Sequence, residues 1–134
     1  MTKVFLAILA MLAASMALAD NPAIERYIAA KIAMLETQAD ELHQAISLMK
    51  TDNLSETDKF ERIGKPGFAA VDRSLAEKGF TPKQFYQFGY DHQREIDQWL
   101  AEHTVSADRI QSLQAEQADL IVEYDQMNNV NHGD

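Results

Sequence analysis

"NPAIERYIAAKIAMLETQADELHQAISLMK", residues 21–50 of a 134-residue chain, contains one proline and no glycine. Asn21 followed by Pro22 is typical of a helix start, with asparagine as the N-cap and proline at the first helical position. Apolar residues then recur at spacings of three, four and seven, which marks one face of an α-helix. That face comprises Ile24, Ile28, Leu35, Ala39, Leu42, Ile46 and Met49. The stretch predicts a helix over residues 22–50, about 40 Å long at 1.5 Å per residue.

The segment that follows this helix predicts short helical pieces separated by a turn. Ser55 and Asp58 have the spacing of a capping box, which indicates one or two helical turns. Glycines and a proline at residues 64–67 predict a turn, and a short helix is then expected to end at Gly79, because glycine favours the position after a helix C-terminus. The buried face expected for this short helix is Phe68, Val71 and Leu75.

Residues 79–99, "GFTPKQFYQFGYDHQREIDQW", hold six of the eleven aromatic residues of the chain. Thr81 is a suitable N-cap, Pro82 a suitable first residue, and Gln84 completes a capping-box spacing. We therefore expect one helix from Thr81 to about residue 103. At 100° per residue its buried face lies within a narrow arc. That face comprises Phe85, Phe88, His92, Ile96, Trp99 and His103.

A last helix is expected to begin at Thr104 or Ser106 and to run to about Met127. Its apolar face comprises Ile110, Leu113, Gln117, Leu120, Ile121 and Tyr124. No strand-like alternation competes with these helical patterns. Amphipathic helices must bury their apolar faces against one another. The predicted fold is therefore all-α, a small helical bundle of three long and one or two short helices over residues 20–127, with a polar disordered tail at 128–134.

Residues 1–19 have the features of a secretory signal peptide. Lys3 precedes an uncharged apolar run, and Ala17-Leu18-Ala19 has small residues at the positions that a signal peptidase requires. A membrane anchor is the alternative interpretation, but the uncharged stretch is shorter than the roughly 20 residues that span a bilayer. The chain has no cysteine, so lipid attachment to cysteine and disulfide formation are excluded. The expected location is the periplasm or the exterior.

Removal of residues 1–19 leaves 115 residues with 11 basic and 21 acidic side chains, a net charge of −10. Such a surface repels nucleic-acid phosphates and anionic lipid headgroups. We therefore expect neither nucleic acid nor, after signal cleavage, a membrane as the partner. The candidate partners that remain are another protein, including one with a cationic surface, and a second copy of the chain.

The chemistry-bearing residues favour binding over catalysis. There is no cysteine nucleophile and no G-x-S-x-G motif, so no catalytic residue is predicted and no cofactor is required. His92 and Glu95 are three residues apart and can share a helix face, and His103 lies near the same helix end. These three residues are the candidate ligands of a metal ion, and a haem bound through His92 or His103 belongs to the same alternative.

The aromatic residues of this region are either core or a partner-binding rim. Helical spacing places Phe85, Phe88 and Trp99 in a core, whereas the projection leaves Phe80, Tyr86 and Tyr90 off-centre. Exposed aromatic side chains commonly grip the apolar groups of a partner. Because the choice between core and rim stays open at this point, the candidate partner-binding residues are Phe80, Tyr86, Tyr90 and Trp99.

"FTPKQ" at residues 80–84 resembles the L-T-x-x-Q motif of Spy-type periplasmic proteins, and "LQAEQ" at 113–117 keeps its outer Leu and Gln but has Gln114 in place of Thr. The resemblance implies a small, secreted, helical protein that dimerises and holds unfolded or stress-related clients without ATP. The acidity of this chain departs from the basic concave surface of the better-known members.

Together these features predict a secreted, non-enzymatic, protein-binding module with an acidic surface, of the chaperone-like, adaptor, inhibitor or immunity type. The alternative function is a metal- or haem-binding periplasmic protein that uses His92 and His103.

Overall fold

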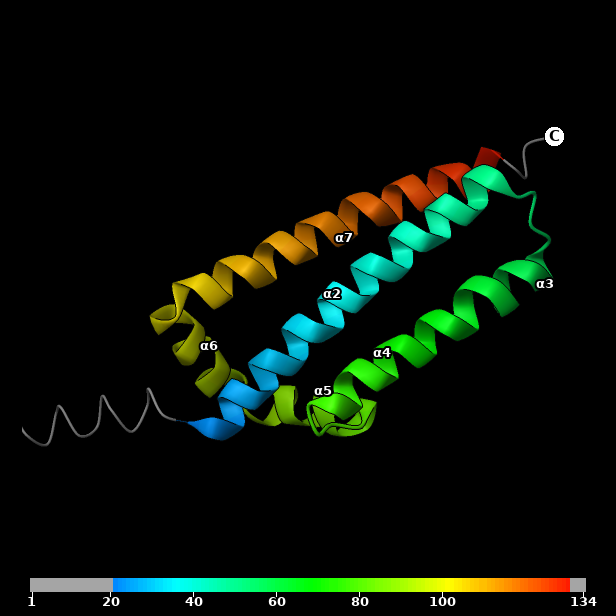
Figure 1. The fold of residues 1–134 in the computed structure, drawn as a ribbon. Coiled ribbons are helices and arrows are strands. Elements are labelled where there is room, and N and C mark those ends of the chain that lie inside the picture. The colour runs from blue at the N-terminus through cyan, green and yellow to red at the C-terminus, as the bar shows by residue number, and fades with distance from the viewer. Residues whose placement is uncertain (1–20, 131–134) are drawn as a thin grey trace, which may run out of the picture.

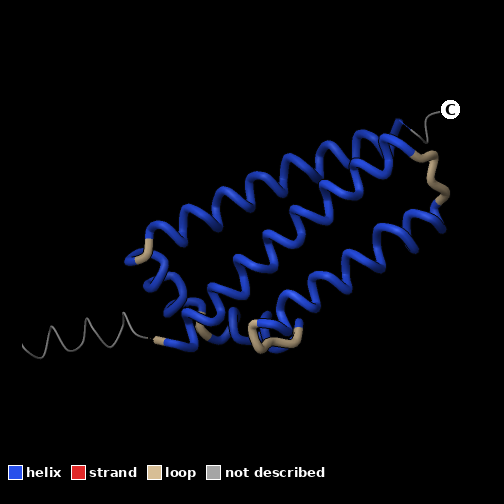
Figure 2. The backbone as a smooth tube through the Cα atoms, in the orientation of Figure 1, coloured by secondary structure: helices blue, strands red, loops and turns tan. Residues whose placement is uncertain are grey.

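The structure, a computed structural model, describes residues 21–130, which are helical except for short turns (Figure 2). The elements are α2 (Pro22–Thr51), α3 (Glu56–Lys59), the π-helical turn η1 (Phe60–Gly64), α4 (Lys65–Glu77), α5 (Pro82–Asp91), α6 (Gln93–Glu102) and α7 (Thr104–Val130). No strand occurs in this range, which confirms the all-α prediction. The predicted signal peptide lies outside the described residues. Within them, no helix has the length and apolar character needed to cross a membrane.

Helix α2 begins as the sequence predicts and lies at the centre of the bundle. The Asn21 side chain accepts a hydrogen bond from the Ile24 backbone N–H at 3.3 Å, and Pro22 opens the helix. α7 packs along one side of α2 and α4 along the other (Figure 1). Because two neighbours cover it, α2 buries a wider face than the predicted stripe, and the additional buried residues are Tyr27, Ala30, Met34 and Ala45.

α2 and α7 run parallel to one another, and polar pairs at constant register join them. The Arg109 guanidinium lies 3.0 Å from the Glu36 carboxylate, and the His43 ring lies 3.0 Å from the Glu116 carboxylate. A third pair, Lys50 with Glu123, has its charged atoms 3.2 Å apart. In each pair the two residues are 73 positions apart, and successive pairs are seven positions apart. A constant offset is possible only for helices that run in the same direction.

This register is that of a two-stranded parallel coiled coil, with the three polar pairs at flanking e and g positions. In α2 the a and d positions are then Ile28, Ile32, Leu35, Ala39, Leu42, Ile46 and Met49. In α7 they are Ile110, Leu113, Gln117, Leu120, Tyr124 and Met127. The two sets meet in the core clusters between the helices. Gln117 is the polar residue at an a position, and its amide donates to Gln38 Oε1 at 2.7 Å. A hydrogen-bonded polar residue at such a position specifies register.

Residues 56–77 form one continuous helical limb, so the turn predicted at residues 64–67 is wrong. The capping box predicted at Ser55 and Asp58 is present and opens the limb. The chain then passes through η1, in which the Lys65 N–H donates to the Phe60 carbonyl, and continues into α4. Proline lacks an N–H, and its ring collides with a carbonyl four residues earlier in a regular α-helix. The wider π turn before Pro66 therefore lets the helix continue. Gly79 ends the limb in the left-handed conformation, as expected, with φ of 85°.

The helix predicted from Thr81 to residue 103 is two helices, α5 and α6. The Thr81 and Gln84 capping box is present at the start of α5, as predicted. At His92 the backbone leaves the helical region, with φ of −116° and ψ of 21°. The break is needed because α5 packs near the end of α4, whereas α6 leads to the start of α7 (Figure 1). One straight helix cannot follow both neighbours around the end of α2.

An aromatic cluster holds this end of the bundle together. Tyr27 of α2 stacks on Phe85 and Phe88, with ring centroids 4.7 and 5.3 Å away, and Phe80 meets it edge-on. Gly89 allows this contact, because a Cβ atom built there would lie 2.6 Å from the Tyr27 hydroxyl oxygen. Burial, with the nearby Tyr86 as a lesser cause, raises the pKa of Tyr27 above its ordinary value of 10.0.

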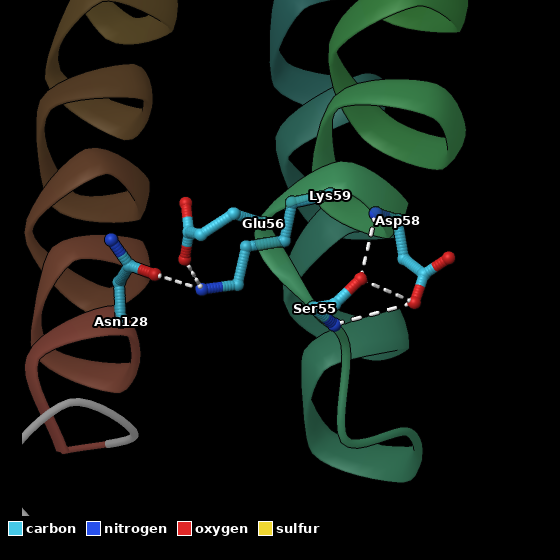
Figure 3. Close-up of polar contacts among 5 residues, drawn as sticks. All are labelled: Ser55, Glu56, Asp58, Lys59 and Asn128. Atoms are coloured by element: carbon cyan, nitrogen blue, oxygen red, sulfur yellow. Dashed lines mark hydrogen bonds and ion pairs between the residues drawn. The ribbon is translucent and has the colours of Figure 1, made fainter.

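At the opposite end, α7 continues to Val130, beyond the predicted end at Met127, so residues 128–130 belong to the bundle. The Lys59 ammonium is buried there and donates to Glu56 Oε1 at 2.7 Å and to Asn128 Oδ1 at 2.6 Å (Figure 3). Lys59 and Asn128 join the limb of residues 56–77 to α7. The rest of the predicted tail, residues 131–134, lies outside the described residues.

Candidate helix-binding groove

A groove of about 570 Å³ runs over α2 between α4 and α7. α4 and α7 both pack on α2 but not on one another (Figure 1), and the α2 residues at the floor of the groove are buried or half-buried. Its α2 and α7 lining comprises Gln38, Glu41, Leu42, Ala45, Gln117, Ile121 and Tyr124. Its lining from the limb and α5 comprises Ile63, Gly64, Gly67, Phe68, Val71, Asp72, Leu75, Pro82 and Tyr86.

The two flanks of the coiled coil differ in composition. The flank away from the groove carries the three polar pairs between α2 and α7, as an ordinary solvated flank does. The groove flank has Gln38 and Ala45 at the g positions of α2 and Ile121 at an e position of α7. Gln38 is hydrogen-bonded to Gln117 and Ala45 is buried, so Ile121 is the exposed apolar residue of this flank.

Two side chains predicted to be core are exposed along this groove. Phe68 of α4 is 74% exposed, and Ile121 of α7 is 45% exposed. Periodicity placed both on apolar faces, which is correct, and those faces pack on α2 through Leu75 and Leu120, but Phe68 and Ile121 lie at their exposed edges. Tyr86 of α5, 62% exposed, adds an aromatic edge at the end of the groove. The walls of the groove thus carry exposed apolar and aromatic side chains.

Both ends of the groove are bounded. At one end, Pro82 and Tyr86 of α5 close it. At the other end, the last lining residues are Ile63 of the limb and Tyr124 of α7. One helical turn further on, Lys59 donates a hydrogen bond to Asn128 (Figure 3). Along the limb the lining extends from Ile63 to Leu75, about 18 Å at 1.5 Å per residue. A helix of about three turns fits this length.

The charge of the groove is purely acidic. Glu41 and Asp72 belong to the lining, and no lysine or arginine does. Neither carboxylate forms an ion pair with a residue of the described part of the chain. Glu41 lies where α2 and α4 approach, 3.8 Å from a Cβ atom built at Gly67. The sequence reasoning missed both acids, because nothing in an acidic sequence distinguishes these two from the other carboxylates.

The candidate partner-binding residues divide into two exposed and two buried side chains. Tyr86 and Tyr90 are 62% and 81% exposed, in keeping with the predicted rim. Phe80 and Trp99 are only 5% and 9% exposed, so their assignment to a binding surface is wrong. Phe80 follows Gly79 out of α4, and the turn directs it into the aromatic cluster under the Arg26 guanidinium, 4.9 Å from the ring centroid. A helical projection that starts at Thr81 does not capture this turn.

The candidate metal ligands are not brought together as a triad. The His92 ring lies 3.1 Å from a Glu95 oxygen and packs on Phe88, as the spacing predicts. His103 lies at the far end of α6, about 15 Å away along that helix. Its ring stacks on the Trp99 indole at 3.7 Å, and its Nδ1 lies 2.7 Å from the Trp99 carbonyl oxygen. Among residues 21–130 there is no group of three or more His, Asp or Glu side chains suited to a metal ion.

Comparison with protein-family models, with curated proteins and with solved structures finds no match to this chain.

Proposed function

We propose that this protein is a secreted, non-enzymatic binding protein whose groove holds an amphipathic helix of a partner protein. The observation that carries the proposal is the groove over α2, with exposed Phe68 and Ile121 on its opposite walls. Contiguous exposed apolar surface in a pocket of this size marks a binding site. The signal-peptide features of residues 1–19 and the resemblance of "FTPKQ" to a motif of periplasmic client-binding proteins support the location and the class of role.

A helix is the occupant that the surroundings favour. The groove is lined by three long helical segments, and its walls carry exposed apolar side chains, Phe68 and Ile121, that the apolar face of a helix can cover. A second copy of the chain would bring an equal negative charge against Glu41 and Asp72. An anionic lipid or fatty acid would place its headgroup against the same carboxylates. Like charges brought together at an interface cost binding free energy, so both occupants are disfavoured.

The proposal is tested with fluorescent peptides of about 12 residues that carry leucines on one helical face. We expect saturable binding measured by fluorescence anisotropy. The double variant Phe68→Ser, Ile121→Ser should weaken it at least tenfold, because the apolar surface that the bound helix would cover is lost. The matched control is Val105→Ser, Val122→Ser, which removes exposed apolar side chains outside the groove lining.

Three outcomes overturn the proposal: no peptide binds, the groove and control variants bind equally well, or the mass measured by light scattering shows that a second copy occupies the groove. The last outcome would be recognised as a dimer that the groove variant converts to a monomer. Far-ultraviolet circular dichroism of each variant verifies that it is folded.

A further inference from the structure

The charged residues of the groove lining lie on one side of it. Glu41 on α2 and Asp72 on α4 both belong to the side of the groove next to the limb. The α7 side contributes Gln117, Ile121 and Tyr124, and it has no Asp, Glu, Lys or Arg in the lining. A helix seated here would therefore meet carboxylates along one flank and neutral side chains along the other.

No lysine or arginine lines the groove or forms an ion pair with these acids, although Arg73 of α4, Lys78 at its C-cap and Lys83 of α5 have no ion-pair partner among the described residues. Lys65 pairs with Glu61 at 2.8 Å, and Arg62 pairs with Asp52 at 2.9 Å. Lys59, at the closed end, is bonded to Glu56 and Asn128. The local field in the groove is thus negative, in a chain whose overall balance is also negative. Partial enclosure by low-dielectric walls strengthens such a field.

From this we infer that the partner helix is basic: it carries lysine or arginine beside its apolar face, and Glu41 and Asp72 select it. The inference rests on the proposed function and adds the charge and the length of the partner. A lysine or arginine on the edge of an apolar helix face can lay its aliphatic stem over Phe68 or Val71 and place its charge at a carboxylate. The lining along the limb, about 18 Å, matches a seated segment of about three turns.

The test compares peptides that share one leucine face and differ in flanking residues, which are lysine, glutamine or glutamate. For two partly exposed charge pairs we expect the lysine peptide to bind about three- to tenfold more tightly than the glutamine peptide. The glutamate peptide should be the weakest. The difference should shrink at about 1 M salt, where the Debye length is only about 3 Å.

Charge-matched variants separate local selection from the net charge of the protein. In Glu41→Gln, Asp72→Asn the preference for lysine over glutamine should fall to about one. In Glu77→Gln, Asp119→Asn, which alters the net charge equally at exposed positions outside the groove lining, the preference should persist.

The two proposals fail in different ways. If all three peptides bind the unaltered protein with equal affinity, or if the groove pair of substitutions leaves the preference intact, the inference of a basic partner is wrong and the binding function stands. If none of the three peptides binds, the proposed function itself is wrong. Because the substitutions are isosteric and lie on partly or fully exposed side chains, folding should be unaffected, which the circular dichroism spectrum verifies.

Discussion

The substitution Gly89→Ala tests the packing of α5 on α2 directly. In most helix interiors this change stabilises, by up to about 1 kcal/mol, because alanine is the better helix former. At Gly89 the new Cβ atom would lie 2.6 Å from the Tyr27 hydroxyl oxygen and 3.2 and 3.3 Å from two ring carbons. The Tyr27 ring cannot retreat easily, because Phe85 and Phe88 stack on it.

Overpacking of this kind costs about 1–3 kcal/mol. A contact of 2.6 Å favours the upper half of this range, about 2–3 kcal/mol. After the gain of about 1 kcal/mol in helix propensity is subtracted, we expect Gly89→Ala to lower the free energy of unfolding by about 1–2 kcal/mol. The assay is urea unfolding followed by circular dichroism, with Trp99 fluorescence as a second probe of two-state behaviour. The matched control is Gly67→Ala, where the nearest side-chain atom would lie 3.8 Å from the new Cβ. There we expect stabilisation of about 0.5–1 kcal/mol.

The background Tyr27→Phe isolates the cause. Removal of the hydroxyl eliminates the shortest contact, and this hydroxyl forms no hydrogen bond with another described residue. In that background Gly89→Ala should therefore cost at least about 1 kcal/mol less than in the unaltered protein. A Gly89→Ala protein as stable as the parent, or an equal cost in both backgrounds, would refute the close approach of α5 to α2.

Three further predictions concern the hydrogen bond between Lys59 and Asn128, the capping box of Asp58 and the aromatic cluster. Asn128→Ala should lower the free energy of unfolding by about 1.5–3 kcal/mol, because buried Lys59 loses a hydrogen-bond acceptor. The control Asn129→Ala, at an exposed neighbouring position, should change the unfolding midpoint in urea little. Hydrogen bonds from the side chain and the backbone of the N-cap serine lower the pKa of Asp58 below 3.8. The stability that this carboxylate contributes is therefore complete above pH 3.8 and is lost as the pH falls through its folded pKa; an NMR titration midpoint at or above 3.8 would contradict this. Phe85→Ala should cost about 3–5 kcal/mol in urea unfolding, because the ring is 2% exposed and stacked in the aromatic cluster. A cost below about 1 kcal/mol would show that the cluster is not part of the core.

The local features of the chain could be predicted because neighbouring residues determine them. Asn21 and Thr81 start helices and Gly79 ends one, since a cap hydrogen bond or a positive φ involves only residues within a single turn. The 3.6-residue periodicity likewise identifies the apolar face of each helix, and it predicted most of the buried residues of α2 and all of those of α7.

The groove could not be predicted in this way. Periodicity states that Phe68 and Ile121 belong to apolar faces, but it cannot state whether another helix covers them, because that depends on how many neighbours the fold supplies. Phe80 shows the converse. Its position off the helical projection indicated exposure, and the turn at Gly79 nevertheless places it inside the aromatic cluster.

By itself, then, the sequence determined an acidic, cysteine-free, all-helical chain with amphipathic segments and most of their starting points. Only the tertiary structure decided that α2 and α7 lie parallel at an offset of 73 residues, that the chain bends at His92, and that α4 and α7 leave the groove between them open. The physical reason is the distance along the chain between the residues in contact. Caps and amphipathic faces arise from contacts within a few residues, whereas register, bends and uncovered surface arise from the simultaneous packing of helices distant in the chain.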